Sequence, residues 1–206
     1  MDYKNRFPVL FTILSLIILT LSFIFTRDRF TWVLEVAPIL IALPLLVFTY
    51  KFFQFSKIIY ILLIIHFVIL AVGGIYTYAE VPLGYWMQDL FGFERNHYDR
   101  IGHFFQGFVP ALVLREILLR TSPIRPGKWL FTIIIWMCLG FSAFYELIEW
   151  WTASSQGASA DAFLGSQGDI WDAQKDMLLA FIGATTALLS LSRIHDRSMA
   201  ANDNRK

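Results

Sequence analysis

Acidic residues occur in closely spaced sets within stretches of the sequence that are otherwise apolar. Glu146 and Glu149 stand near the end of a run that begins WLFTIIIWMCLGFSA and closes with FYELIEWW. Residues three or four apart lie on one face of a helix, so both carboxylates are expected to point in one direction. A charged side chain at the bilayer centre costs roughly 2.5 to 3.5 kcal/mol on insertion scales, so such residues should be hydrated, protonated, paired or functional.

Two further sets also have a spacing that places their members on one helical face. Asp99 and His103 are four residues apart, as are Asp172 and Asp176, with Asp169 one turn earlier. Several carboxylates with one imidazole and no thiolate suit Mg²⁺, Mn²⁺, Ca²⁺ or Fe²⁺ better than a structural zinc. The candidate metal ligands are Asp99, His103, Glu146, Glu149, Asp172 and Asp176. The candidate catalytic residues among them are His103, Glu146 and Asp172.

A divalent ion held by such residues could activate water or hold a phosphate, while a spare carboxylate acts as a general base. The basic side chains close to these acids are Arg100 and Lys175, together with His103 if it is protonated. The alternative is that the carboxylates are hydrated at the membrane interface. In that case Asp99 and Asp169 favour the positive amino-terminal ends of helices.

The composition sets the environment in which these residues must be placed. Of the 206 residues, 57% are hydrophobic and only 16% are charged, which is typical of a membrane protein. Stretches of about 20 apolar residues are long enough to span the hydrocarbon layer as helices. The predicted fold is an all-α membrane bundle of about six helices forming one domain over residues 1–206. Its spans fall near 8–25, 30–50, 57–78, 101–119, 129–151 and 170–192.

The distribution of Lys and Arg predicts the orientation of the bundle. Most of the 17 basic residues fall on the side of the amino terminus, whereas Arg27, Arg29, Arg95 and Arg100 fall on the opposite side. The positive-inside rule therefore predicts that both termini are cytoplasmic. All the acidic sets then lie in the outer third of the bilayer, so we expect the three helix faces that carry them to meet. The first span follows Lys4 and Arg6 but has no small-residue cleavage site, so we expect it to be retained.

The connections and the remaining polar residues carry weaker expectations. Residues 80–100 have the makeup of a segment in the membrane interface, and residues 152–169 could be a mobile lid or a slack connector. The tail HDRSMAANDNRK is expected to be disordered, which leaves His195 outside the candidate site. We expect His66 to be a hydrogen-bonded packing residue and Cys138 to be a small apolar packing residue. No nucleotide-binding or hydrolase motif is present, and no basic patch suggests nucleic acid as a partner.

Three blocks of the sequence together resemble a known family. They are NHYDRIGHFFQGFVPALVLREILLR, FYELIEWW and GDIWDAQKDMLLAFIGA, and the resemblance is clearest over residues 96–183. They are similar to the YjdF family of bacterial inner-membrane proteins, itself a domain of unknown function. The resemblance implies a multi-pass protein of the bacterial inner membrane and brings no assigned activity.

A more distant resemblance is to the VanZ-like proteins linked to glycopeptide resistance. It rests on the order of Asp99, His103 and Phe104, followed by a late Glu in the next helix and an Asp cluster opening the last. Those proteins have Lys, Asn and Gly where this chain has Arg100, Asp176 and Leu179.

Three functional hypotheses are consistent with the sequence. The first is a metal-assisted enzyme or binding site at the outer membrane face, acting on a lipid or cell-envelope precursor. The second is a small proton-coupled transporter that uses the same carboxylates as titrating groups, although few polar residues are apparent in the cytoplasmic half of the spans. The third is a non-catalytic membrane interaction protein, for which every replacement of an acidic residue would be silent.

Overall fold

Helices make up the regular structure of the described part of the chain. The computed structural model describes residues 6–156 and 166–203, and it has no strand in these ranges. The main helices are α1 (Arg6–Phe25), α2 (Arg29–Thr49), α3 (Lys57–Tyr76), α5 (Tyr98–Thr121), α6 (Lys128–Gln156) and α8 (Asp172–Asp203). Each contains a segment long and apolar enough to cross a membrane. The expected all-α class with six spans is confirmed.

Local sequence explains several helix ends. Asp28 caps α2, because its carboxylate accepts hydrogen bonds from the Phe30 backbone at 2.9 Å and the Thr31 hydroxyl at 2.7 Å. The hydrogen bond from Thr31 is the main reason that the pKa of Asp28 is lowered. The short helix α4 (Pro82–Phe91) begins with proline and ends at Gly92, whose φ of 68° suits glycine.

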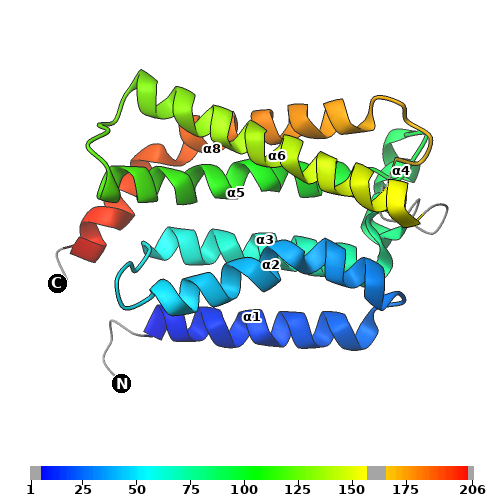
Figure 1. Cartoon of the computed structure of the whole chain (residues 1–206), viewed down its shortest axis with the longest axis horizontal. Coiled ribbons are helices and arrows are strands. Elements are labelled where there is room, and N and C mark those ends of the chain that lie inside the picture. The colour runs from blue at the N-terminus through cyan, green and yellow to red at the C-terminus, as the bar shows by residue number, and fades with distance from the viewer. Residues whose placement is uncertain (1–5, 157–165, 204–206) are drawn as a thin grey trace.

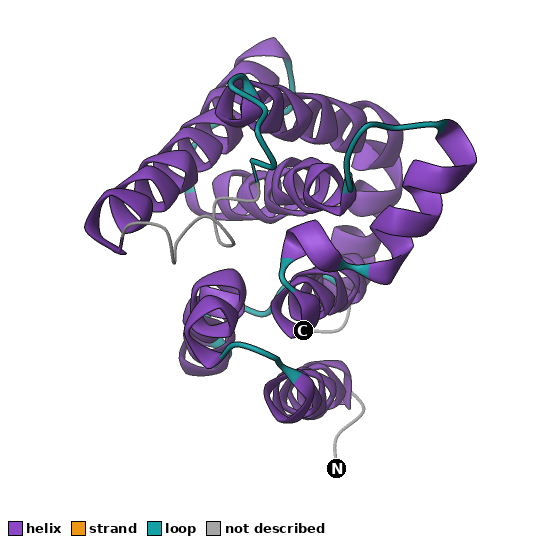
Figure 2. Ribbon diagram, turned by 90° about the vertical axis from the view of Figure 1, so that its right-hand side faces the viewer, coloured by secondary structure: helices purple, strands orange, loops and turns teal. Residues whose placement is uncertain are grey.

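The helices form two groups that meet through α3 and α5. The group α1, α2 and α3 lies on one side, and α5, α6 and α8 lie on the other (Figures 1 and 2). The short helix α4 lies at one end of the bundle, following the short 3₁₀ helix Tyr78–Glu80 (Figure 1). It exposes Tyr85, Trp86 and Phe91, in keeping with an interfacial segment.

The packing of α5 against α8 is the most extensive contact between helices. A methyl group added at Gly107 of α5 would lie 1.8 Å from the carbonyl oxygen of Ala180. A methyl group added at Gly183 of α8 would lie 2.0 Å from the carbonyl oxygen of Phe104. The two backbones therefore touch, as small residues allow in membrane helix pairs. This contact fixes the register between the polar residues at the two ends of the pair.

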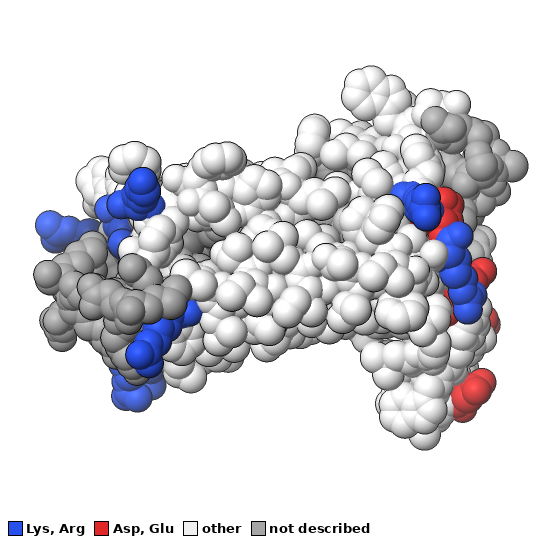
Figure 3. All heavy atoms as spheres, turned by 90° about the horizontal axis from the view of Figure 1, so that it is seen from below, with Lys and Arg blue, Asp and Glu red and all other residues white. Residues whose placement is uncertain are grey.

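The two ends of the bundle carry different charges. One end, where α1 and α6 begin and α8 finishes, shows Lys and Arg without acidic residues on the face in Figure 3. The opposite end shows both kinds of charge on that face (Figure 3). We call these the basic end and the acidic end. The start of α1 and the finish of α8 share the basic end (Figure 1), while its assignment to the cytoplasm remains a prediction.

The carboxyl-terminal segment differs from the expectation of a disordered tail. Helix α8 continues to Asp203, well past the expected end of the span at residue 192. The reason lies in packing, because His195 is fully buried against α5 and is hydrogen-bonded there. A polar segment can stay helical where its polar groups find partners on a neighbouring helix.

Candidate functional site

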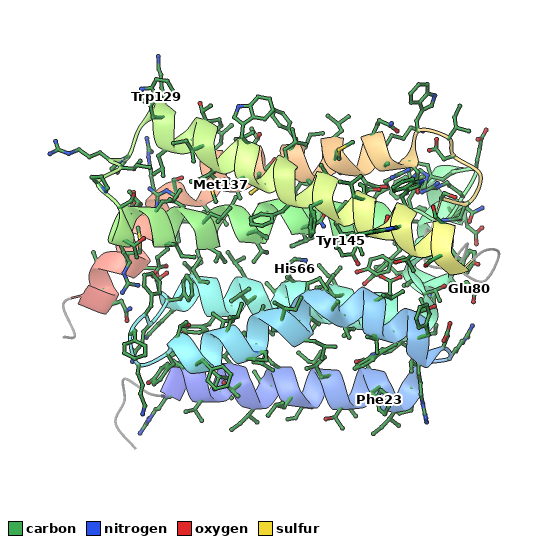
Figure 4. The ribbon with its side chains drawn as sticks, viewed as in Figure 1. Phe23, His66, Glu80, Trp129, Met137 and Tyr145 are labelled. Carbon is green, nitrogen blue, oxygen red and sulfur yellow. The ribbon has the colours of Figure 1, made fainter. Side chains whose placement is uncertain are left out.

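The acidic end brings together residues from four helices. Asp99 and His103 lie in the first turns of α5, and Asp172 and Asp176 lie in the first turns of α8. Glu146 and Glu149 come from the last turns of α6, and Glu35 comes from α2. Most of these side chains are buried. The expected meeting of the three acidic helix faces at one depth is therefore what the structure shows, and Figure 4 shows oxygen and nitrogen atoms gathered at the ends of the bundle.

His103 is central to this cluster. Its Nε2 lies 3.3 Å from Oδ1 of Asp99 and 3.9 Å from Oδ1 of Asp176. Its Nδ1 lies 2.9 Å from Oε1 of Gln106 and 3.8 Å from Oε1 of Glu146. When Nδ1–H donates to Gln106, the ring is oriented with Nε2 toward the two aspartates. This is the kind of support that fixes a ligating histidine.

Asp99, His103 and Asp176 have the geometry of a metal-binding group. One possible ligand atom from each lies within 4.8 Å of the other two, and all three residues are buried. Within residues 6–156 and 166–203, this is the one such group of three or more His, Cys, Asp or Glu side chains. It contains three of the six ligands expected from the sequence. We call it the Asp99–His103–Asp176 group.

Two arginines hold the aspartates of α8. Arg100 binds Asp176 through Nη1, and its Nη2 lies 2.5 Å from Oδ1 of Asp172 and 3.3 Å from Oδ2 of Asp169. Nη2 of Arg95 approaches the same Asp172 oxygen at 2.8 Å, without the geometry of a hydrogen bond. Asp172 therefore lies between two guanidinium groups.

Arg95 is a residue that the sequence reasoning missed. It precedes α5 in the connection from α4, where the sequence suggested only an interfacial segment. Its side chain also donates to the Ser166 carbonyl. Beside it, the Asn96 backbone N–H donates to Oε1 of Gln167 at 3.1 Å, and Nε2 of Gln167 donates to the Asn96 carbonyl at 2.8 Å. These contacts fix residues 166–169 next to α5, whereas residues 157–165 of the possible lid lie outside the described residues.

Glu146 and Glu149 bring two neighbouring acids from α6 into the cluster. They lie three residues apart on one face of α6, and Glu149 is buried. Oε1 of Glu146 is buried and, among the described residues, has no hydrogen-bond partner. An unpaired buried oxygen is costly, so this atom is well placed to accept a ligand, a proton or a cation.

Tyrosines close the side of the cluster that faces α2 and α3. The Tyr145 ring lies edge-on to His103 with a centroid distance of 6.3 Å, and its hydroxyl donates to the Leu34 carbonyl at 3.4 Å. The Tyr78 ring occupies the space left by Gly73 and Gly102. Burial raises the pKa of Tyr78 well above its usual range, and nearby Glu35 adds to the shift, so this phenol stays neutral.

Carboxyl groups outnumber cationic groups at the acidic end. The carboxyl groups are Glu35, Asp99, Glu146, Glu149, Asp169, Asp172 and Asp176, and the basic side chains beside them are Arg95, Arg100, Lys175 and His103. Lys175 contacts only Asp169 among these acids, with Nζ 2.5 Å from Oδ2. Its hydrogen bond is the main reason that the pKa of Asp169 is lowered. The excess of acid favours a bound cation or proton.

A second buried polar cluster lies at the basic end, and sequence reasoning missed it as well. Oε1 of Glu116 accepts from the Ser56 backbone N–H and from Nη1 of Arg120, each at 2.8 Å. Oε2 accepts from the Ser56 hydroxyl at 2.6 Å and lies 2.9 Å from Nε2 of His195. Nη1 of Arg115 lies 3.2 Å from the other nitrogen of His195. Because arginine only donates, this histidine accepts at Nδ1 and donates from Nε2.

Other packing expectations have mixed outcomes. Cys138 is buried, with its sulfur 3.8 Å from the Gly107 carbonyl oxygen, as expected for a packing residue. His66 is also buried in α3 (Figure 4), but its Nε2 has no hydrogen-bond partner among the described residues. The expectation of a hydrogen-bonded histidine is therefore not met at that nitrogen.

Six spanning helices with a buried acidic cluster at one end define a polytopic membrane protein. The chain matches the family model described as "Predicted membrane protein (DUF2238)" over residues 7–197, and it belongs to that family. It is 47% identical over 189 residues to inner membrane protein YjdF of Escherichia coli (strain K12), covering 90% of each chain. The YjdF-like resemblance is thus confirmed, and neither the family match nor this relative supports the VanZ-like one. No solved structure matches the chain significantly.

Proposed function

We propose that the acidic end holds a divalent cation and that this site binds, and acts on, a lipid or cell-envelope precursor in the bacterial inner membrane. The observation that carries the proposal is the Asp99–His103–Asp176 group, whose possible ligand atoms lie within 4.8 Å of one another. Oxygen ligands with one imidazole suit Mg²⁺, Mn²⁺, Ca²⁺ or Fe²⁺. The membrane assignment follows the family, and the inner membrane follows the name of the relative.

The residues around the group divide into ligands and supports. Asp99 and His103 are the first ligands, and Asp176 joins them while Arg100 holds its carboxylate. Glu146 lies outside this group, with its unpartnered Oε1 3.8 Å from Nδ1 of His103 rather than beside Nε2, so we assign it the role of a general base next to the ligands. We assign Asp172 a positioning role, since it lies between Arg95 and Arg100 and keeps both guanidinium groups beside the site.

The arrangement fits chemistry on a phosphate-bearing molecule. A bound divalent ion would polarise a phosphoryl oxygen or lower the pKa of a bound water. The free oxygen of Glu146 can accept a proton from an attacking hydroxyl or water. The guanidinium groups of Arg95 and Arg100 are suited to a phosphate oxygen, provided that they exchange part of their contact with Asp172.

Metal binding by the purified full-length protein tests this proposal. We expect elemental analysis to find a divalent metal and Mn²⁺ titration to show one site, with His103→Gln and Asp99→Asn each weakening Mn²⁺ binding at least about ten-fold. Glu80→Gln is the matched control, because Glu80 is an exposed acid at the same end that pairs with Arg27. Equal Mn²⁺ affinity in the wild type, both site variants and the control would remove the metal site.

A second candidate function is proton-coupled transport. The pair Glu146 and Glu149 favours it, because two largely buried carboxyl groups one helical turn apart repel each other when both are charged and so favour a bound proton. The buried cluster around Glu116 supplies polar groups in the opposite half of the bundle, where the sequence had suggested few. The close backbones at Gly107 and Gly183 weigh against it, since they leave no room for water between α5 and α8. Proton flux into proteoliposomes that is lost in Glu149→Gln would favour transport over the metal site.

A further inference from the structure

A pocket lies at the basic end, far from the acidic cluster. It has a volume of about 200 Å³ and is lined by α5, α6, α8 and the residues just before α6. Its apolar wall includes Leu130, Ile134 and Leu188, and its polar lining includes Arg115 and Ser192. The pocket therefore joins a buried guanidinium group to an apolar surface, which is an unusual combination for a packing defect.

Arg115 is the group in this pocket most able to bind a ligand. Its side chain is only 5% exposed, with Nη2 2.7 Å from Oδ1 of Asp196 and Nη1 3.2 Å from Nδ1 of His195. An arginine has five N–H donors, so these two contacts leave donors available. Within the described residues, His195 and Asp196 are its polar partners. A guanidinium group with spare donors in a low-dielectric pocket favours an anion with several oxygens, such as a phosphate.

The charges around the pocket favour the same class of ligand. Arg125 and Lys128 are exposed beside Pro126 and Gly127, and Arg193 is exposed next to Ser192. The nearby acids are already paired, because Glu116 binds Arg120 and Asp196 binds Arg115. The first N–H groups of α6 also start at this point and lack acceptors within their own helix. An anion entering the pocket therefore meets a net positive rim.

The surroundings indicate that the anion belongs to a lipid. Trp129 is 80% exposed and extends from the start of α6 (Figure 4), as aromatic residues do at a membrane interface. Trp136 and Leu189 are 66% and 74% exposed on the outer faces of α6 and α8, where acyl chains can lie. Basic pockets between membrane helices are suited to phospholipid headgroups.

We propose that this pocket binds the phosphate of an anionic phospholipid from the leaflet at the basic end. Arg115 contacts the phosphate, Lys128 and Arg125 supply the long-range attraction, and the apolar wall carries the upper part of the acyl chains. This site is separate from the proposed cation site and does not depend on it. If the basic end is cytoplasmic, as the distribution of Lys and Arg predicts, the lipid comes from the inner leaflet.

The test is a lipid titration of the purified full-length protein followed by native mass spectrometry. Phosphatidylglycerol and phosphatidylcholine with the same acyl chains are the two lipid probes, and inorganic phosphate is the third. We expect one phosphatidylglycerol to bind at least about ten-fold more tightly than phosphatidylcholine. This ratio corresponds to the attraction of one or two basic side chains for an anionic lipid.

Ser192→Leu is the main variant, because removing Arg115 would also break its ion pair with Asp196. The Ser192 hydroxyl donates to the Leu188 carbonyl of its own helix, so its replacement fills the pocket without breaking a contact between helices. We expect this variant to lose the preference for phosphatidylglycerol and Lys128→Gln to weaken it about five-fold. Arg197→Gln is the matched control, since Arg197 is exposed at the same end and does not line the pocket.

Three outcomes would overturn the proposal. The first is an unchanged preference for phosphatidylglycerol in Ser192→Leu. The second is an equal loss in Arg197→Gln, which would indicate a diffuse charge effect. The third is binding of inorganic phosphate that depends on Ser192 and Lys128 without any preference between the lipids, which would assign the pocket to a free anion.

Discussion

The helix pair α5 and α8 carries a buried polar cluster at each end, and the two clusters differ in how well they are satisfied. At the basic end, each oxygen of Glu116 has two hydrogen-bond partners. His195 is hydrogen-bonded through both ring nitrogens. At the acidic end, carboxyl groups outnumber the cations, and Oε1 of Glu146 has no hydrogen-bond partner among the described residues.

This difference indicates that the two clusters have different roles. A buried network in which every group is paired adds rigidity and specifies one arrangement of the helices. A buried group left unpaired lowers stability and is retained where a ligand or reaction uses it. The basic-end cluster is therefore interpreted as structural around Glu116 and His195. The acidic-end cluster is interpreted as functional around Asp99, His103 and Glu146.

The largest predicted effect is on the stability of Glu116→Gln. Its new amide would face donors from Ser56, Arg120 and His195, and the charge that balances Arg120 would be lost. Removing one partner from a buried ion pair typically costs about 3 to 5 kcal/mol. We expect a loss of this size in the free energy of unfolding, measured in mixed micelles of mild detergent and SDS.

The matched variant at the other end is Glu146→Gln. It replaces a carboxyl group that already lacks a partner on one oxygen and lies next to Glu149. We expect the free energy of unfolding to change by less than about 1 kcal/mol, since no satisfied bond to Oε1 is broken. A loss in Glu146→Gln as large as that in Glu116→Gln would contradict the division into structural and functional clusters.

An intermediate effect is predicted at the contact that separates the two clusters. In Gly107→Ala the new methyl group would lie 1.8 Å from the Ala180 carbonyl oxygen, so α5 and α8 must move apart. Overpacking of this kind typically costs about 1 to 3 kcal/mol. Gly140→Ala in α6 is the control, because nothing lies within 4 Å of its added methyl group and alanine favours a helix. Equal melting temperatures for the two variants would rule out a close-packed centre.

The fold and the location of the acidic site could be predicted from the sequence for one physical reason. Membrane spans are set by length and hydropathy, so the depth of each charged residue follows directly from its distance to the end of its span. Helical spacing then assigns Asp99 with His103, and Asp172 with Asp176, to common faces. Three such faces at one depth were enough to predict that they meet.

The pairing of individual side chains could not be predicted in this way. Arg95 reaches Asp172 because of how the connection before α5 folds. The spacing of residues along a helix does not predict this contact, because Arg95 lies outside a helix. His195 reaches Glu116 because α8 continues beyond the apolar segment, where hydropathy gives no signal. Arg115 and Glu116 within a predicted span were the available clue, because two adjacent charges there require partners.

The smallest predicted effect concerns the edge of the acidic cluster and depends on pH. Lys175 lies 2.5 Å from Asp169 but is half exposed, so solvent weakens the pair. The pKa of Asp169 is lowered chiefly by this hydrogen bond. A lowered folded-state pKa means that the contribution to stability is present above the ordinary pKa of aspartate, about 4, and is lost as the pH falls through the folded-state value. We expect Lys175→Gln to lower the melting temperature slightly and equally between pH 5 and 8.

The same pair sharpens the comparison between the two ends at low pH. Once Asp169 is protonated, Lys175 has no charge to meet there, so the melting curves of the wild type and Lys175→Gln should converge as the pH falls through the lowered folded-state pKa of Asp169. Thermal unfolding followed by circular dichroism from about pH 2 to 8 measures this, with Arg197→Gln as an exposed control at the basic end. A melting temperature of Lys175→Gln that rises above that of the wild type as the pH falls would mean that repulsion of the lysine by another cation, such as Arg100, outweighs its attraction to Asp169. Positive charge would then dominate around Lys175, although carboxyl groups outnumber basic side chains at the acidic end.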